Sequence, residues 1–317
     1  MNKRCTDFIC ALLLTVLLPF MLFNTVMLWS DEEVRPATVP DETVGTTDPE
    51  SVSVRVLRSD GTVQTMELEE YLAGVVMGEM PLDFHPEALK AQAVVARTYT
   101  LRMRETSSKH PNADVCDRAA CCQSYRESAS AESWEAVKST AGQVLTYNGV
   151  LIEATYFSST GGRTEDALAV WGSDVPYLQS VDSPESGGTD NLLETVTFTA
   201  EEFREILGID PDGPCGNWFG DVCYTDGGGV ATMEIGGEIF QGTELRKLLG
   251  LRSTDMSVSA VGEHIIITTR GYGHRVGMSQ YGAEAMAVSG ATYQEILAHY
   301  YQGTTLELFV DKGSAVG

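Results

Sequence analysis

The chain has 317 residues, of which 43% are hydrophobic, so it is long enough for one large or two ordinary globular domains. Its formal net charge of −24 argues against nucleic acids and anionic membrane surfaces as partners. We find no internal repeat, and the predicted strands and helices follow no regular β-α-β order. We therefore expect an α+β fold, with mixed helices and short antiparallel strands around one core.

The first 50 residues predict a membrane anchor and a linker. Residues 1–7 are basic, and residues 8–29 form an uncharged run that as a helix is about 30 Å long, the thickness of a bilayer core. The basic flank places the N-terminus in the cytoplasm and the rest outside. A cleaved signal peptide is the alternative, although the run is long for one and no A-x-A-like site follows it. Residues 30–50 are rich in Pro, Thr and acids, so they predict a solvated linker to an extracytoplasmic domain over 51–317.

Residues 69–99 predict two helices separated by a break that contains prolines. Apolar residues recur at helical spacing before Pro81, and Pro86 is a favourable first residue for the second helix. Glu79 lies at the end of the first helix in apolar surroundings, and Arg97 lies near the middle of the second. Because burial raises the pKa of a carboxyl group, Glu79 is a candidate proton donor. A local cap or salt bridge is the alternative role for Glu79.

Turn and cap residues predict most of the remaining elements. Alternating valines predict a strand over 51–58 that pairs with 62–68, and Ser130 is a candidate N-cap. Residues 209–229 predict an irregular surface segment. The other predicted elements are, in chain order, a helix over 130–141, a hairpin of 143–147 and 150–157 around Asn148-Gly149, a helix over 199–207, a hairpin around Gly236-Gly237, a helix over 243–249, strands over 257–261 and 264–269, helices over 279–288 and 293–301, and a strand over 306–310.

One histidine and three cysteines follow the second helix closely: His110, Cys116, Cys121 and Cys122. One imidazole and two thiolates fill three of the four positions of a tetrahedral zinc site, and Cys121 or a water is the candidate fourth ligand. Such a site is structural, because the loop has no core of its own. A disulfide is the alternative in an extracytoplasmic domain. Cys215 and Cys223 either form a small-loop disulfide or stay free.

Two polar, glycine-containing loops are candidate binding segments. In 271–283 (GYGHRVGMSQYGA) the glycines let backbone approach a ligand. The alternative is that the loop only connects a strand to a helix. Its candidate substrate contacts are His274, Gln280 and Tyr281. The other loop, YFSSTGGRTED, places Ser158 and Ser159 after a buried strand, a position that often lines a cleft. We find no Ser-His-Asp or Cys-His signature.

The order of these motifs resembles that of the SpoIID/LytB family, also called the amidase-enhancer family. The resemblance covers about residues 51–310. The segments that carry it are Tyr71–Pro81, Ala91–Tyr99, His110–Gln123, Ser158–Thr164, Val175–Leu178 and Gly273–Ala283.

This resemblance implies a lytic transglycosylase, which cleaves the peptidoglycan glycan between N-acetylmuramic acid and N-acetylglucosamine and leaves a 1,6-anhydro end. It implies that Glu79 is the general acid and base, and that Arg97, Tyr177 and Tyr281 contact the substrate or support activity. It also implies zinc ligands at His110, Cys116 and Cys122. Three positions depart from the family pattern: Gln179 replaces a lysine, Arg275 a glycine, and Cys121 a histidine.

The resemblance also implies partners and a cellular role. The expected partners are stage II sporulation protein P, which removes stem peptides, and stage II sporulation protein M. The expected process is engulfment of the forespore, with the domain on the mother-cell side of the septum.

The expected reaction needs one carboxyl group, because the C6 hydroxyl of muramic acid is the nucleophile, whereas hydrolases that use water need two. A hydrolase that uses Glu79 and Asp83 is an alternative. Another alternative is a non-catalytic glycan-binding protein that activates a separate cell-wall amidase.

Overall fold

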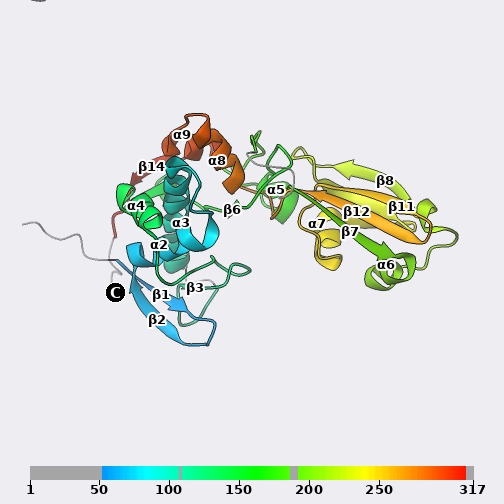
Figure 1. The fold of residues 1–317 in the computed structure, drawn as a ribbon, viewed down its shortest axis with the longest axis horizontal. Coiled ribbons are helices and arrows are strands. Elements are labelled where there is room, and N and C mark those ends of the chain that lie inside the picture. The colour runs from blue at the N-terminus through cyan, green and yellow to red at the C-terminus, as the bar shows by residue number, and fades with distance from the viewer. Residues whose placement is uncertain (1–51, 107–108, 186–191, 312–317) are drawn as a thin grey trace, which may run out of the picture. The chain divides into compact units, whose positions relative to one another are not determined.

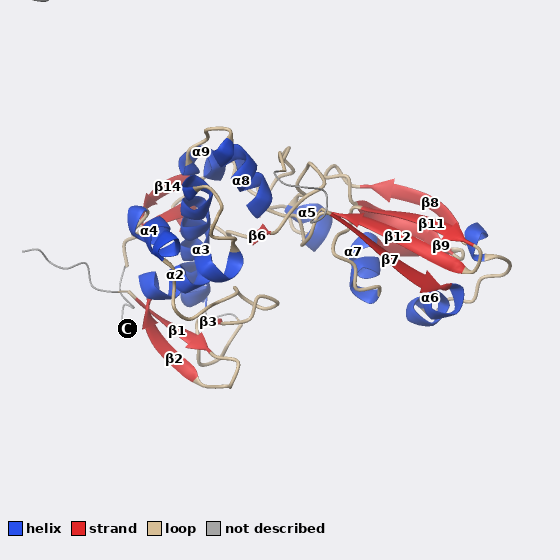
Figure 2. Cartoon of the chain, in the orientation of Figure 1, coloured by secondary structure: helices blue, strands red, loops and turns tan. Residues whose placement is uncertain are grey.

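A computed structural model of the chain describes residues 52–106, 109–185 and 192–311 (Figure 1). Helices and small sheets follow one another in mixed order, so the predicted α+β class is confirmed (Figure 2). The predicted anchor and linker, 8–29 and 30–50, lie outside the described residues. Among the helices that are described, none is both long and apolar enough to cross a bilayer.

Two helices form the centre of the first hydrophobic cluster. Helix α2 (Leu68–Glu79) ends because Met80 is extended and Pro81 has no N–H to continue the helical hydrogen bonds, and α3 (Pro86–Thr106) begins at the predicted proline. Fully buried apolar residues on both helices pack together. The same cluster includes side chains from α4 (Ala131–Ser139), which Ser130 caps as predicted, α8 (Gln280–Val288) and α9 (Tyr293–Tyr300).

Three small sheets accompany these helices. Their strands are β1 (Ser53–Leu57), β2 (Val63–Glu67) and β3 (Val115–Cys116); β4 (Gln143–Tyr147), β5 (Val150–Leu151) and β14 (Thr305–Leu308); and β6 (Tyr156–Phe157) with β13 (Met278–Ser279). Most pairs are antiparallel, but β1 pairs with β3 in parallel, and β6 pairs with β13 in parallel, Tyr156 with Met278. This pairing brings the two predicted polar loops side by side.

A second hydrophobic cluster lies within residues 193–270. Its sheets have the strand orders β11-β12-β7 and β10-β9-β8. The strands are β7 (Leu193–Thr199), β8 (Phe219–Tyr224), β9 (Val230–Ile235), β10 (Glu238–Gln241), β11 (Met256–Val261) and β12 (His264–Arg270). Helices α6 (Ala200–Leu207) and α7 (Gly242–Leu248) pack against them, and Phe203 of α6 is fully buried.

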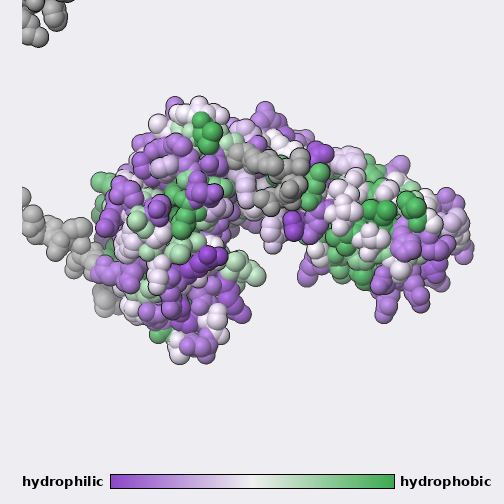
Figure 3. Space-filling model, in the orientation of Figure 1, coloured by the Kyte–Doolittle hydropathy of each residue, from purple (hydrophilic) through white to green (hydrophobic). Residues whose placement is uncertain are grey.

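The prediction of one core is therefore wrong, because these strands and helices enclose apolar side chains of their own. The predicted irregular segment 209–229 contains strand β8, and β7 and the short helix α5 (Ala167–Trp171) were not predicted. Hydrophilic residues cover most of the face seen in Figure 3, with hydrophobic residues gathered over the part that contains the second cluster.

Arg97 connects several elements of the first cluster. Its guanidinium is fully buried and binds Glu69 of α2 through two hydrogen bonds of 2.9 and 2.6 Å. It also donates to the backbone carbonyls of Val137 in α4 and Gln143 in β4, each at 3.2 Å. One buried cation thus holds α2, α3, α4 and β4 together.

We expect Arg97→Met to destabilise the protein by about 3 kcal/mol, because it leaves two carbonyls and part of a carboxylate without their donor. The midpoint of urea unfolding measures this loss. Arg104→Met is the matched control, since both side chains of its ion pair with Asp311 are about a third exposed and the pair should contribute less than about 1 kcal/mol. Equal midpoints for the two variants would contradict the assignment.

Candidate functional site

A cavity of about 500 Å³ lies beside the C-terminal end of α2. Its wall combines segments that are far apart in the sequence: α2, α3, the loop after α3, strand β6 and the loop between β12 and β13. Among the predicted catalytic and substrate-binding residues, four line it: Glu79, Ser158, His274 and Gln280. The parallel pairing of β6 with β13 explains why residues 158, 274 and 280 meet.

Glu79 is the residue at which α2 reaches this cavity. Its Oε1 accepts a hydrogen bond of 2.5 Å from the backbone N–H of Ser124. The Tyr156 hydroxyl and the Gln280 amide face the same carboxyl group as further donors. Burial raises the pKa of Glu79, and the three donors, which favour the carboxylate, offset only part of that effect. A carboxyl group with a raised pKa suits a general acid.

Residues 121–126, which we call the strap, lie against α2 and bring the Ser124 N–H to Glu79. The close approach requires two glycines of α2. A Cβ atom at Gly78 would lie 2.8 Å from the Ser124 carbonyl oxygen, and one at Gly74 would lie 2.6 Å from the Arg126 carbonyl oxygen. The Arg126 N–H also donates to the Gly74 carbonyl at 3.1 Å. The spacing of Gly74 and Gly78, one helical turn apart, thus positions the strap.

Aromatic rings and uncharged polar groups form another part of the cavity wall. The His274 ring lies 5.3 Å from that of Trp171 and 5.7 Å from that of Phe157, and its Nδ1 accepts from the Val276 N–H. Burial lowers the pKa of His274 to about 4, so the imidazole is neutral at neutral pH. Ser158 lines the same wall. Flat apolar faces beside neutral hydrogen-bonding groups can bind a polyhydroxylated ligand.

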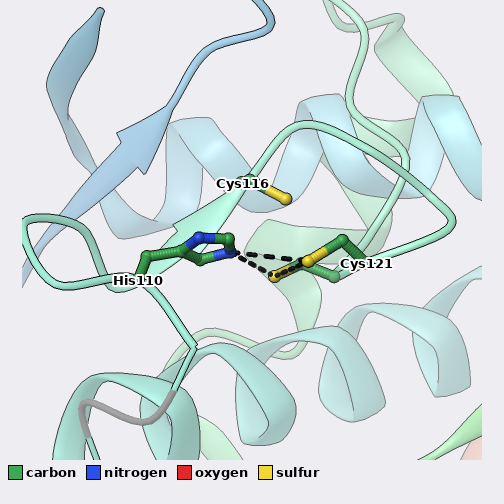
Figure 4. A group of neighbouring side chains, drawn as sticks. His110, Cys116 and Cys121 are labelled. Atoms are coloured by element: carbon green, nitrogen blue, oxygen red, sulfur yellow. Dashed lines mark hydrogen bonds between the residues drawn. The ribbon is translucent and has the colours of Figure 1, made fainter. Parts of the chain in front are cut away.

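The structure brings the four predicted metal ligands together (Figure 4). The ligand atoms of His110, Cys116, Cys121 and Cys122 all lie within 4.8 Å of one another. His110 Nε2 is 3.4 Å from Cys122 Sγ and 3.6 Å from Cys121 Sγ, and the two sulfurs are 4.0 Å apart. Tetrahedral zinc would require about 3.5 Å for nitrogen–sulfur and about 3.8 Å for sulfur–sulfur pairs, so these residues fit the ion.

The alternative of disulfides is not seen among the described residues. Cys116, Cys121 and Cys122 are free, and so are Cys215 and Cys223. Cys121 and Cys122 belong to the strap and also line the cavity that contains Glu79. The candidate metal cluster and the candidate proton donor are therefore parts of one site.

Other predicted substrate contacts lie elsewhere. Arg97 is fully buried against Glu69, and Ser159 is fully buried as well, so neither of these predicted substrate contacts lies on the cavity wall. Tyr177 is 9% exposed, and its hydroxyl accepts from the N–H of Glu153, a residue that lines the cavity.

Tyr281 also lies outside the cavity lining. Its N–H donates to the Ser158 carbonyl, and its ring packs edge-on against Phe84. The first contact ties Tyr281 to the Ser158 segment, and the second ties it to the break between α2 and α3.

The two other departures from the family pattern have structural explanations. Arg275 has a φ of +66°, a conformation that glycine adopts more easily, and its guanidinium pairs with Glu165 at 3.3 Å, both side chains being 1% exposed. It also donates to the Arg163 carbonyl at 2.9 Å. Gln179 donates to the Val175 carbonyl within its own turn and does not line the cavity.

Several residues of the site were not predicted. Glu153, Trp171 and Tyr272 line the cavity, as does Lys109. Tyr156 faces Glu79 but carried no motif of its own. One signal was available, because residues two apart on a strand share a face, and Tyr156 is two residues before Ser158.

Comparison with known proteins tests the resemblance. A family model described as SpoIID, stage II sporulation protein, matches residues 58–147. Stage II sporulation protein D of Bacillus subtilis (strain 168) is 42% identical over 80% of this chain and 79% of its own, and that of Bacillus amyloliquefaciens is 41% identical over 80% and 78%. The amidase enhancer of Bacillus subtilis is 33% identical over 74% of this chain and 40% of its own. The protein belongs to the SpoIID family of stage II sporulation proteins.

Proposed function

We propose that this protein is a lytic transglycosylase, which cleaves denuded glycan strands of peptidoglycan between N-acetylmuramic acid and N-acetylglucosamine and leaves 1,6-anhydro ends. The observation that carries the proposal is the environment of Glu79. Its carboxyl group is largely buried, has a raised pKa and is faced by three uncharged donors, on the wall of a cavity that can hold sugar residues. Such a carboxyl group can hold a proton at rest and release it to a leaving group.

The proposed reaction uses Glu79 twice. Protonated Glu79 donates its proton to the glycosidic oxygen as the bond from that oxygen to the anomeric carbon of muramic acid breaks. The resulting carboxylate then takes the proton of the muramic C6 hydroxyl, whose oxygen bonds to the anomeric carbon. The proton count balances, and Glu79 ends in its initial state. The Ser124 N–H stabilises the carboxylate between the two steps.

A two-carboxylate hydrolase is the alternative reaction, and its products distinguish it. Asp83, the second acid expected for it, lies in a different hollow of about 560 Å³, which it shares with Glu79. Glu153 is the other carboxylate on the wall of the main cavity. A hydrolase would release reducing ends, whereas the proposed reaction releases products that lack one water.

The second candidate function is a non-catalytic one, in which the protein binds glycan and activates a separate cell-wall amidase. The similarity to a protein named amidase enhancer favours it. In this case the strands would stay intact and would co-sediment with the protein.

We place the reaction in engulfment of the forespore. The supporting observations are membership of the SpoIID family and the sequence of residues 1–50, with its basic start and uncharged run. The proposed arrangement is a single-pass membrane protein, with its catalytic domain outside the cytoplasm on the mother-cell side of the septum. Stage II sporulation protein P would supply denuded strands by removing stem peptides, and stage II sporulation protein M would be a further partner.

We also propose a structural zinc ion, held by His110, Cys116, Cys121 and Cys122. The fit of their distances to tetrahedral coordination supports it. The ion would cross-link the loop after α3 and so fix the start of the strap. The strap's Ser124 then holds Glu79 in place.

Glu79→Gln tests the acid. Glutamine keeps the shape but has no proton to donate, so we expect normal folding and a loss of glycan cleavage of about a thousandfold. Mass spectrometry of denuded strands after incubation with the full-length protein in detergent measures the anhydro products. Asp83→Asn is the control and should keep its activity. Cleavage retained in Glu79→Gln, or lost in Asp83→Asn, would contradict the assignment.

The pH dependence follows from the raised pKa of Glu79. The reaction needs the protonated form, so kcat/KM should be high at low pH and fall as pH rises through the pKa of Glu79 in the free enzyme. Because burial raises this pKa, the fall should be centred above pH 4.5, the ordinary value. An activity that instead rises with pH across this range would mean that the ionised carboxylate starts the reaction.

Loss of a cysteine ligand tests the metal site. We expect the full-length protein to retain zinc through purification and Cys122→Ser to bind it at least about 100-fold more weakly, with a lower melting temperature. Elemental analysis and a chelator titration measure the binding. Cys223→Ser is the matched control, because Cys223 is exposed and outside the cluster. Equal zinc content in the two variants would refute the site.

A further inference from the structure

A chain of hydrogen bonds leads from α3 to the Tyr156 hydroxyl, which faces the carboxyl group of Glu79. Thr100 Oγ1 donates to the Ala96 carbonyl at 2.7 Å. Gln123 Nε2 donates to Thr100 Oγ1 at 2.9 Å, and the Tyr156 hydroxyl donates to Gln123 Oε1 at 3.3 Å. The side chains of Thr100 and Gln123 are fully buried, so water cannot replace these partners.

The direction of these hydrogen bonds is fixed by a backbone carbonyl. A threonine hydroxyl has one proton, and that of Thr100 is used on Ala96, so its oxygen can only accept from Gln123. The amide nitrogen of Gln123 must therefore face Thr100, and its carbonyl oxygen must face Tyr156. Tyr71, on the nitrogen side of the amide, accepts from it at 3.5 Å.

Tyr156 has one proton and two possible acceptors. Its hydroxyl donates to Gln123 and also faces the carboxyl group of Glu79. Burial raises the pKa of Tyr156 well above its ordinary value, so the hydroxyl keeps its proton at every physiological pH. The proton can be directed to Gln123 or to Glu79 by rotation about the C–O bond alone.

We propose that Tyr156, held by Gln123, is a positioning residue that satisfies both protonation states of Glu79. While Glu79 carries its proton, the Tyr156 hydroxyl donates to Gln123 and its oxygen can accept from Glu79. When Glu79 becomes a carboxylate, the hydroxyl turns and donates to it. This inference rests on the proposed function, since it concerns the change of Glu79 from acid to base.

The Ser124 N–H cannot make this change, because a backbone N–H only donates. The Gln280 amide donates to Gln92 at 3.4 Å, and in this orientation its nitrogen favours the carboxylate as well. Without an acceptor for its proton, the Tyr156 hydroxyl would be a third permanent donor to Glu79. It would lower the pKa of Glu79 and so reduce the fraction of Glu79 that carries a proton.

Other titratable groups share the cavity and set the background for a pH measurement. None of them is among the groups that shift the pKa of Glu79, which are Ser124, Tyr156 and Gln280 beside its burial. The titratable residues on the cavity wall besides Glu79 and Tyr156 are Tyr99, Lys109, Cys121, Cys122, Glu153, Tyr272 and His274.

Two variants test the proposal, because they should shift the pKa of Glu79 in opposite directions. Tyr156→Phe removes a donor to the carboxylate, so the pKa of Glu79 should rise further and kcat should fall about tenfold with little change in KM. Gln123→Met removes the second acceptor, so the Tyr156 hydroxyl donates to Glu79 permanently and the pKa of Glu79 should fall. NMR titration of ¹³C-labelled glutamate carboxyl groups in the full-length protein measures both, with Glu79→Gln to assign the signal.

Two further variants guard against an effect of folding alone. Thr100→Val is nearly isosteric and frees the Gln123 amide to flip, so it should lower the pKa of Glu79 as Gln123→Met does. Tyr300→Phe is the matched control, because Tyr300 is a buried tyrosine whose hydroxyl contacts Ser183 outside the cavity. It should change neither the pKa of Glu79 nor kcat.

Shifts in the same direction for Tyr156→Phe and Gln123→Met, or no shift in either, would overturn the proposal. The titrations need no substrate, so they decide whether Tyr156 turns even if wild-type protein leaves glycan strands intact. Intact strands would refute the proposed transglycosylase, whereas cleavage without opposite shifts would refute only the role of Tyr156.

Discussion

The hydrogen bond between the Ser124 N–H and Glu79 depends on how closely two pieces of backbone can approach. Helix α2 carries no side chain at Gly74 and Gly78, so the strap can lie directly on it. Any Cβ atom at either position would collide with a strap carbonyl and move Ser124 away from Glu79. The geometry of the candidate acid is therefore set by two glycines that have no chemistry of their own.

The strap also joins features that the sequence presents separately. Cys121 and Cys122 belong to the metal cluster, Gln123 directs the Tyr156 hydroxyl, and Ser124 holds Glu79. These roles fall on consecutive residues, so a displacement of one residue also moves the others. A metal ion held by this cluster would therefore fix the segment that positions Glu79.

Local signals predicted much of this arrangement, and long-range contacts account for what they missed. The proline break after Glu79 and the Ser130 cap depend on neighbouring residues, and both are confirmed. Strand β7 exists because it pairs with β12, some 70 residues away in the chain, a contact without a local signal. The spacing of the cysteines predicted their cluster, whereas the role of Arg97 depends on Glu69, a partner that spacing does not single out.

The position of Arg97 also bears on the strength of the acid. A guanidinium beside Glu79 would stabilise the carboxylate and lower its pKa, and the proton needed for the first step would be lost. Arg97 is instead fully engaged by Glu69 and two backbone carbonyls, and Glu79 is faced by a backbone N–H, a hydroxyl and an amide. Neutral donors can fix the orientation of the carboxyl group while burial keeps its pKa high. The structure thus keeps the ion pair of Arg97 apart from Glu79, as the proposed role of Glu79 as acid and then base requires.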